Sequence, residues 1–189
     1  MQAIQSLFSS FQLLTEEEFT SFTEGLVLRN LKKGEFFIQE GSVCRQVAFI
    51  SSGLFRSFYH SSTGDEVTYC FTFEHSFLTA FSSYITQQPT EENIEALTDV
   101  ELLLASKEKM DELEQNHVNW LALSKYLAQI EYINMEKRVF MLQKETAETR
   151  YRDLLENHPD YLHLIPLQYL ASYLGITPRH LSRIRKAII

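Results

Sequence analysis

The chain has 189 residues, of which 44% are hydrophobic, and it carries a formal net charge of −8. That length suffices for one large domain or two small ones with a real hydrophobic core. The sequence has no basic segment followed by an apolar run at its start, and nowhere do 18 apolar residues follow one another. We therefore expect a cytoplasmic protein without a membrane partner.

Cysteine and histidine usage argues against a metal, cofactor or catalytic centre. The two cysteines, Cys44 and Cys70, form no Cys-x-x-Cys pair, and an iron–sulfur cluster needs about four ligands. No P-loop, nucleophile elbow or paired-histidine motif occurs. We expect His60 and His75 to be solvated turn residues. Glu74 and His75 follow an alternating strand, so their side chains point in opposite directions and do not form one site. We expect no enzyme activity, no cofactor and no metal.

The first 26 residues predict two short helices. Apolar residues recur there at mostly helical intervals, interrupted by Thr15 and three glutamates. A threonine suits the cap of a second helix, and acids suit its first turn. We expect the aromatic side chains of both helices to cover one end of the following domain.

From residue 26 to residue 106 the pattern becomes typical of β-structure. Short apolar runs alternate with glycine-containing turns, and the runs cover residues 26–31, 35–39, 46–51, 54–60, 66–73, 76–78, 93–97 and 101–105. Eight short strands at this spacing indicate a closed or rolled antiparallel domain rather than βαβ units.

Residues 107 to about 149 predict a short helix followed by a long one from about residue 117. The long helix carries two apolar stripes on different sides, at about 100° per residue. One comprises Leu123, Tyr126, Leu127, Ile130, Ile133 and Phe140, and the other Leu121, Ala128, Tyr132, Met135, Val139 and Leu142. One domain surface buries one stripe, so the second favours the same helix of a second chain and hence a homodimer. A helix sunk in its own core is the alternative, and the pattern does not say which stripe faces a partner.

Residues 149–164 predict a short amphipathic helix followed by a helix exit and turn at residues 157–160, and the sequence then predicts a helix-turn-helix. Pro166 suits the first turn of one helix and Gly175 its end, while Thr177 and Pro178 suit the cap and first residue of the next. So short a link forces a sharp crossing. Ala171 would lie at the closest approach, with Leu181 and Ile184 turned inward.

The second of these helices presents a basic face. The span 164–189 has three arginines, one lysine and no acid, and arginine can bind guanine edges while lysine and serine hold phosphates. We expect contacts to double-stranded DNA from Thr177, Pro178, Arg179, His180, Ser182, Arg183, Arg185 and Lys186. An ordinary helical hairpin with a solvated basic face is the alternative.

This order of parts resembles the Crp/Fnr family of bacterial transcription regulators, in the version found in Bacteroidetes-type bacteria. The resemblance covers essentially the whole chain and is carried by residues 32–35 (KKGE), 40–41 (EG), 49–53 (FISSG) and 174–183 (LGITPRHLSR). It implies an α+β protein: a cyclic nucleotide-binding-like, cupin-like β-roll or jelly roll over residues 1–116, a dimerisation helix over 117–148, and an all-α helix-turn-helix domain over 149–189.

The resemblance also implies a function, namely sequence-specific DNA binding in transcription regulation. The family arginine that matches Arg183 contacts DNA. Arg179 stands where many members have a base-reading glutamate, so the target sequence should differ. The alternative is a dimeric small-molecule sensor or adaptor that has lost specific DNA binding.

The sequence departs from the family pattern where cyclic nucleotides bind. No lysine or arginine occurs from residue 57 to 106, an interval with eight acids, and the arginine expected near residue 90 is missing. A buried phosphate without a cation costs several kcal/mol, so we expect no response to cyclic AMP or cyclic GMP. A filled core and an unknown small apolar effector both stay open. The candidate effector pocket comprises Phe71, Phe77, Leu78, Thr79, Ala80, Thr90, Glu91 and Glu92.

Overall fold

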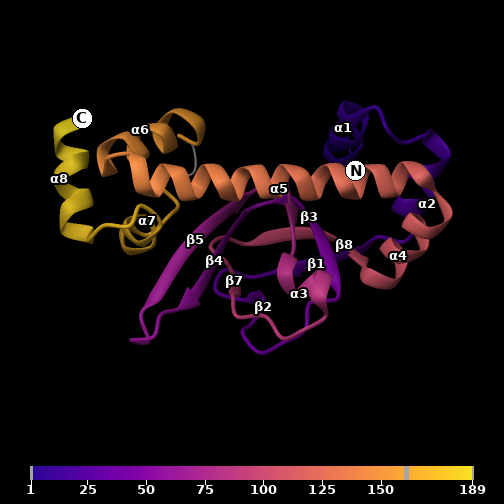
Figure 1. Cartoon of the computed structure of the whole chain (residues 1–189), viewed down its shortest axis with the longest axis horizontal. Coiled ribbons are helices and arrows are strands. Elements are labelled where there is room, and N and C mark those ends of the chain that lie inside the picture. The colour runs from indigo at the N-terminus through magenta and orange to yellow at the C-terminus, as the bar shows by residue number, and fades with distance from the viewer. Residues whose placement is uncertain (1, 160–161, 189) are drawn as a thin grey trace. The chain divides into compact units, whose positions relative to one another are not determined.

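The computed structural model describes residues 2–159 and 162–188 and divides into two compact units (Figure 1). The roll unit comprises the chain up to Ser57 together with Phe71–Ile130. The C-terminal unit comprises Phe58–Cys70 together with the chain from Glu131 onward. The long helix and one β-hairpin therefore contribute residues to both.

The helices and strands follow the expected order, with one additional short helix between the sixth and seventh strands. The helices are α1 (Gln2–Phe11), α2 (Glu16–Glu24), α3 (Phe81–Thr86), α4 (Lys107–Asn116), α5 (Val118–Lys144), α6 (Ala147–Asn157), α7 (Leu167–Tyr173) and α8 (Pro178–Ile188). The strands are β1 (Val27–Leu31), β2 (Phe36–Ile38), β3 (Gln46–Ser52), β4 (Leu54–His60), β5 (Glu66–Phe73), β6 (Phe77–Leu78), β7 (Asn93–Ala96) and β8 (Val100–Ser106). All eight expected strands are confirmed, each within one residue of its expected bounds.

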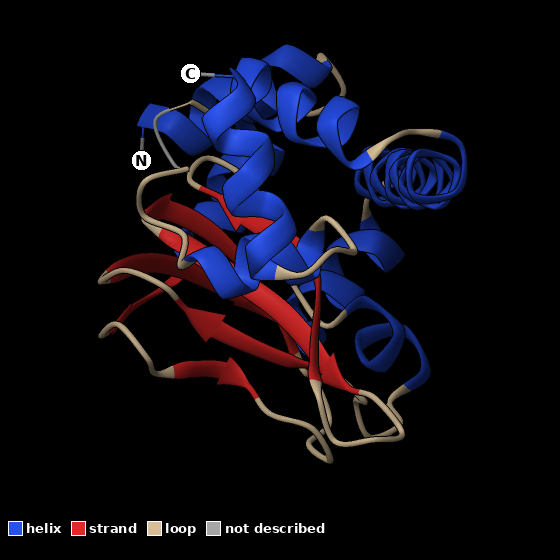
Figure 2. Ribbon diagram, turned by 90° about the vertical axis from the view of Figure 1, so that its left-hand side faces the viewer, coloured by secondary structure: helices blue, strands red, loops and turns tan. Residues whose placement is uncertain are grey.

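The strands form two four-stranded sheets, in the orders β1-β8-β3-β6 and β2-β7-β4-β5 (Figure 2). The pairs β1/β8, β3/β8, β3/β6 and β2/β7 are antiparallel. The sharp turn between β3 and β4 requires a glycine. Gly53 has φ +102°, and a Cβ added there would lie 2.4 Å from Val100 Cγ1. The fold is thus the expected α+β roll followed by helices.

Side chains that alternate along the strands build two cores. Ala48 and Ile50 on β3 join Phe55, Ile94 and Leu102 in the core of the roll. The residue between them, Phe49, lies instead in a second cluster formed with α1, α2, α4 and the start of α5. This division follows from the two-residue period of a strand.

The second cluster is aromatic, as the sequence indicates. The Phe8 and Phe22 rings lie 5.2 Å apart, and Phe22 lies 4.9 Å from Trp120 of α5, which is 1% exposed. Thr15 caps α2: its side chain accepts from Glu18 N at 3.2 Å, and Thr15 N donates to the Glu18 carboxylate at 2.9 Å. The two N-terminal helices therefore cover the outer face of one sheet.

Among the described residues, no helix combines the length and the apolar character needed to cross a membrane.

Candidate nucleic-acid interface

The turn between α7 and α8 has the geometry that its sequence predicts. Gly175 has φ +68°. Its N–H donates to Ser172 O at 3.0 Å, and Ile176 N–H donates to Ala171 O at 3.0 Å. This pair of bonds is the Schellman motif, which ends a helix in a left-handed residue. Three residues then separate Leu174 from the first residue of α8.

A small core holds the two helices against each other. Leu170, Ala171 and Leu174 of the first helix are at most 1% exposed, and Leu181 and Ile184 of α8 are 0% and 8% exposed. These inward positions match the expected ones. The cap is also present, because Thr177 Oγ1 accepts from His180 N at 3.2 Å.

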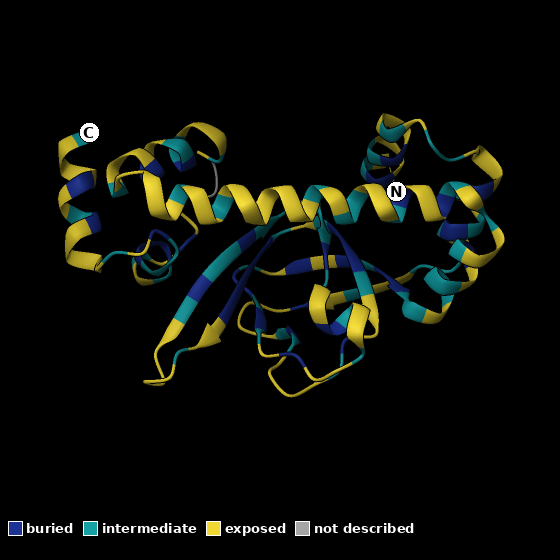
Figure 3. Cartoon of the chain, viewed as in Figure 1, coloured by how far each residue is buried: buried dark blue, intermediate teal, exposed yellow. Residues whose placement is uncertain are grey.

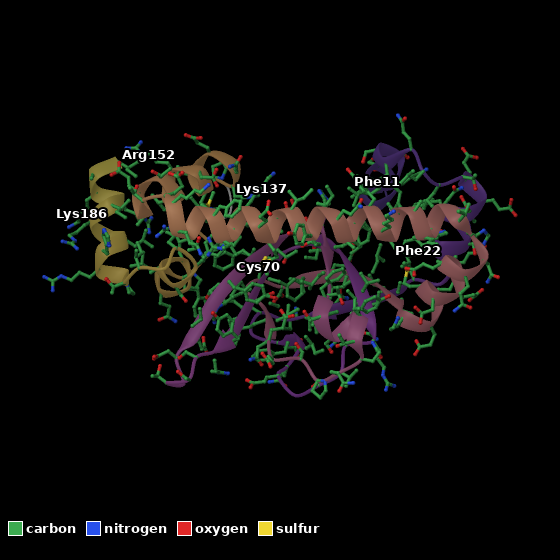
Figure 4. The ribbon with its side chains drawn as sticks, viewed as in Figure 1. Phe11, Phe22, Cys70, Lys137, Arg152 and Lys186 are labelled. Carbon is green, nitrogen blue, oxygen red and sulfur yellow. The ribbon has the colours of Figure 1, made fainter. Side chains whose placement is uncertain are left out.

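The face of α8 opposite this core carries the residues predicted to contact DNA. Seven of the eight are exposed: Thr177, Pro178, Arg179, His180, Arg183, Arg185 and Lys186. Ser182 is half-buried and donates to Pro178 O at 3.0 Å. No ion pair in the described parts of the chain occupies the three arginines or the lysine. The Lys186 side chain extends from α8 into solvent (Figure 4).

Two arginines that the sequence did not single out connect α7 to its neighbours. Arg150 of α6 is 8% exposed and donates to Leu174 O through Nε at 3.1 Å and Nη2 at 2.8 Å. Arg138 of α5 donates through Nη2 to Tyr173 O and stacks its guanidinium 3.8 Å from the Tyr173 ring centre. Burial lowers the pKa of Arg138 and raises that of Tyr173. The sequence pattern around Arg138 and Arg150 does not predict these hydrogen bonds, because their carbonyl partners lie far along the chain.

The hairpin segment of the C-terminal unit also contacts α7. Thr68 N on β5 donates to Ser172 Oγ at 2.9 Å, and Ser172 Oγ lies 3.3 Å from Glu66 O, to which it donates. The first helix of the pair is therefore anchored by side chains or backbone from β5, α5 and α6.

The long helix α5 leaves much of its apolar surface exposed (Figure 3). The structure divides the first predicted stripe: Leu123 is 1% exposed and the half-buried Leu127 packs against the aromatic cluster of the roll unit, whereas Tyr126, Ile133 and Phe140 are exposed. The large apolar side chains of α5 that stay exposed are Val118, Leu121, Tyr126, Tyr132, Ile133, Met135, Val139, Phe140 and Leu142.

The residues proposed for an effector pocket are distributed rather than gathered. Leu78 and Ala80 lie in the roll core, whereas Phe77 points to the outer cluster, 5.7 Å from Phe8 and 5.8 Å from Phe49 between ring centres. Thr79 Oγ1 donates to Gln46 O at 2.9 Å. Phe71 and Thr90 are buried, Glu92 is half-buried and Glu91 is exposed.

Two pockets formed by described residues lie outside the core of the roll. One, of about 240 Å³, lies at the β1 and β8 edge near Asn30 and Asp99. The other, of about 280 Å³, lies between α1 and α2 near Phe8 and Phe19.

Arg56 is a buried cation that the sequence did not predict, and it directly precedes the interval 57–106 without lysine or arginine. It is 1% exposed, and its Nη1 lies 3.7 Å from Glu95 Oε2 on β7. Since Phe55 faces the roll core, alternation turns Arg56 to the opposite face of β4. The described residues contain no cluster of three or more histidine, cysteine or acidic side chains that could hold a metal ion.

Comparison with known proteins agrees with this geometry. Residues 28–117 match a family model described as the cyclic nucleotide-binding domain. No curated protein matches the sequence. Among solved structures, FixK2 from Bradyrhizobium japonicum is similar with a TM-score of 0.76 and 18% identity, covering 86% of this chain and 84% of that one.

Two further solved structures have the same architecture. A putative transcriptional regulator of the crp/fnr family from Eubacterium rectale has a TM-score of 0.71 and 18% identity, over 94% of this chain and 84% of that one. The c-di-GMP responsive global regulator CLP of Xanthomonas campestris has a TM-score of 0.63 and 16% identity, over 92% and 91%. At these identities the likeness establishes the fold.

Proposed function

We propose that this chain, whose residues 28–117 match the model of the cyclic nucleotide-binding domain and whose fold is similar to that of Crp/Fnr transcriptional regulators, regulates transcription by binding specific DNA sequences. The observation that carries the proposal is the exposed basic face of α8. That helix is capped by Thr177 and fixed by its own small core, so its cations project from a rigid element.

The side chains on that face suit the two kinds of contact that DNA offers. Arg179 and Arg183 are one helical turn apart and can bind guanine edges in the major groove. Lys186 and the backbone at the start of α8 suit phosphates, which position a protein without reading sequence. Arg183 is the main specificity residue in this proposal.

The exposed apolar surface of α5 supports a homodimer. Tyr132, Met135 and Val139 are each at least 47% exposed. Covering these side chains with a second copy would remove apolar surface from water and so stabilise a dimer. Two copies of α8 in a symmetric dimer would read half-sites about 34 Å apart, one turn of DNA, in a roughly palindromic site.

The roll supports regulation without cyclic AMP. No lysine or arginine lies between residues 57 and 106, and the nearest buried cation, Arg56, already has a carboxylate 3.7 Å away. A cyclic nucleotide phosphate in the core would meet no lysine or arginine from residues 57–106, and a buried phosphate without a cation costs several kcal/mol.

The test is selection of bound duplexes from a randomised pool by the full chain at about 0.15 M salt, with and without cyclic AMP. Enrichment of one inverted repeat in both conditions is the expected result. Enrichment only with cyclic AMP would contradict the inference that the roll does not bind cyclic AMP. No enrichment in either condition would favour the alternative, a dimeric sensor or adaptor without specific DNA binding.

A further inference from the structure

The C-terminal end of α7 leaves two backbone carbonyls for side chains to satisfy. A helix ends with four carbonyls that have no partner within it. Here the Schellman motif supplies N–H donors to Ala171 O and Ser172 O, each at 3.0 Å. The carbonyls of Tyr173 and Leu174 come next, at the point where the chain turns toward α8.

Both of these carbonyls accept from arginines. Arg138 Nη2 donates to Tyr173 O, and Arg150 donates to Leu174 O through two nitrogens, at 3.1 and 2.8 Å. Every terminal carbonyl of α7 from Ala171 to Leu174 therefore has a donor. Positive charge is also favoured at this end, where the helix dipole is negative.

Arg150 reaches a second helix end with its remaining nitrogen. Its Nη1 donates to Glu145 O at 2.6 Å and lies 3.4 Å from Leu142 O, at the end of α5. One buried guanidinium therefore joins the last turn of α5 to the last turn of α7. A lysine could not reproduce this, because only guanidinium has several donors fixed in one plane.

Arg138 holds the same turn less completely. Its guanidinium stacks on the Tyr173 ring at 3.8 Å, but its buried Nε and Nη1 have no acceptor among the residues that the structure describes. Arg150, 8% exposed and bonded to three carbonyls, is therefore the main tie.

We propose that Arg150, assisted by Arg138, is a positioning residue for α8: it fixes the turn after Leu174 to α5 and so sets the angle at which the recognition helix meets DNA. Only residues 175–177 separate this fixed point from Pro178. The inference rests on the proposed function of α8. It makes Arg150 necessary for sequence discrimination although its side chain does not face DNA.

The test compares Arg150→Lys with Arg152→Lys in the full chain. Arg152 lies on the same helix but is exposed and pairs with Glu148 at 2.8 Å (Figure 4), so its variant matches the change in chemistry without touching α7. A second pair, Arg138→Lys and Lys137→Arg, makes the same comparison on α5.

Affinity is measured for the duplex that wild type enriches and for a scrambled duplex. Arg150→Lys should weaken binding to the enriched duplex at least about tenfold, the equivalent of one lost charge-assisted hydrogen bond. Binding to the scrambled duplex should stay within about twofold, because phosphate contacts from α8 remain. A merely structural role would lower the melting temperature and leave the ratio of the two affinities unchanged, and that result would overturn the proposal.

Amide hydrogen exchange tests the positioning role of Arg150 without DNA. The Gly175 and Ile176 amides, both bonded within the Schellman motif, should exchange at least about tenfold faster in Arg150→Lys than in wild type or Arg152→Lys. Unchanged exchange at these amides would refute the positioning role. If wild type enriches no duplex, the proposed DNA function fails, whereas the exchange comparison still decides whether Arg150 fixes the turn.

Discussion

The two units bury an arginine in opposite ways. In the roll unit, Arg56 has the side-chain carboxylate of Glu95 3.7 Å away. In the C-terminal unit, Arg150 donates to backbone carbonyls at the ends of two helices. The first arrangement neutralises a cation with an acid, whereas the second uses a cation to join segments of backbone.

The overall charges follow the same division. The roll unit has eight lysines and arginines against 16 acids, and the C-terminal unit has nine of each. Under the proposed function, the acidic roll unit would repel DNA and the basic face of α8 would attract it. The comparison teaches that a buried arginine can form an ion pair in one unit and, as proposed above, position a helix in the other.

The largest expected effect comes from breaking the ion pair between Arg56 and Glu95 in the roll unit. Arg56→Ala should lower the free energy of unfolding by about 3 to 5 kcal/mol, because it leaves the Glu95 carboxylate without its buried partner. Arg45→Ala, at an exposed position in the same unit, should change it by less than about 0.5 kcal/mol. Urea unfolding of both variants measures the difference, and equal stabilities would show that the pair is not needed.

A charge on the apolar surface of α5 should break the dimer without unfolding either unit. Val139 is 47% exposed, so Val139→Glu costs little in the monomer. In a dimer it buries an unpaired charge, and the dimer dissociation constant should rise at least about a hundredfold. Sedimentation at several concentrations measures this, with Glu136→Gln, an exposed neighbour on the same helix, as the control. A monomeric wild type at micromolar concentration would exclude the dimer itself.

The recognition helix should lose specificity when one arginine is removed. Arg183→Ala should weaken binding to the enriched duplex by about 1 to 3 kcal/mol and relax the choice of base at one position. Arg185→Ala removes an equal charge and should instead weaken all duplexes alike. Equal affinities of wild type and Arg183→Ala for every sequence would exclude base reading by Arg183.

The smallest effect is a pH dependence in the roll unit. Burial raises the pKa of Glu18, but hydrogen bonds from Thr15 N and Asn119 Nδ2 outweigh it and hold the pKa below 4.5. A carboxyl whose pKa is lower in the folded state adds stability above pH 4.5, and that stability is lost as the pH falls through the folded value. Glu18→Gln should flatten the acid limb of a stability curve measured from about pH 6 downward. An unchanged limb would show that other groups determine it.

Local patterns predicted the strands and the helix-turn-helix well, because their causes are local. The two-residue alternation and the glycine turns placed the strands within one residue, and Gly175 and Thr177 adopt the cap roles expected of them. The helix α6 starts earlier than the expected residue 149, because Thr146 Oγ1 accepts from Thr149 N and caps it.

Features that depend on distant partners could not be predicted in this way. Arg150 looks like a surface residue until Leu174 O, 24 residues further on, is placed beside it. The two stripes of α5 were visible, but only packing shows that Leu123 belongs to the roll unit. Phe77 could face either side of its two-residue strand, and the aromatic cluster around Phe8 decides that it faces outward.

The contribution of residues 58–70 to the C-terminal unit limits how nature or an experimenter can recombine this protein. A single crossover near residue 130 would join the helix-turn-helix of one relative to a hairpin that evolved with another. The backbone segment that bonds Ser172, at Glu66 and Thr68 in this chain, would then come from a different relative than Ser172 itself. We therefore expect chimaeras that exchange the hairpin together with the C-terminal segment to keep α7 in its native setting better than a single crossover does.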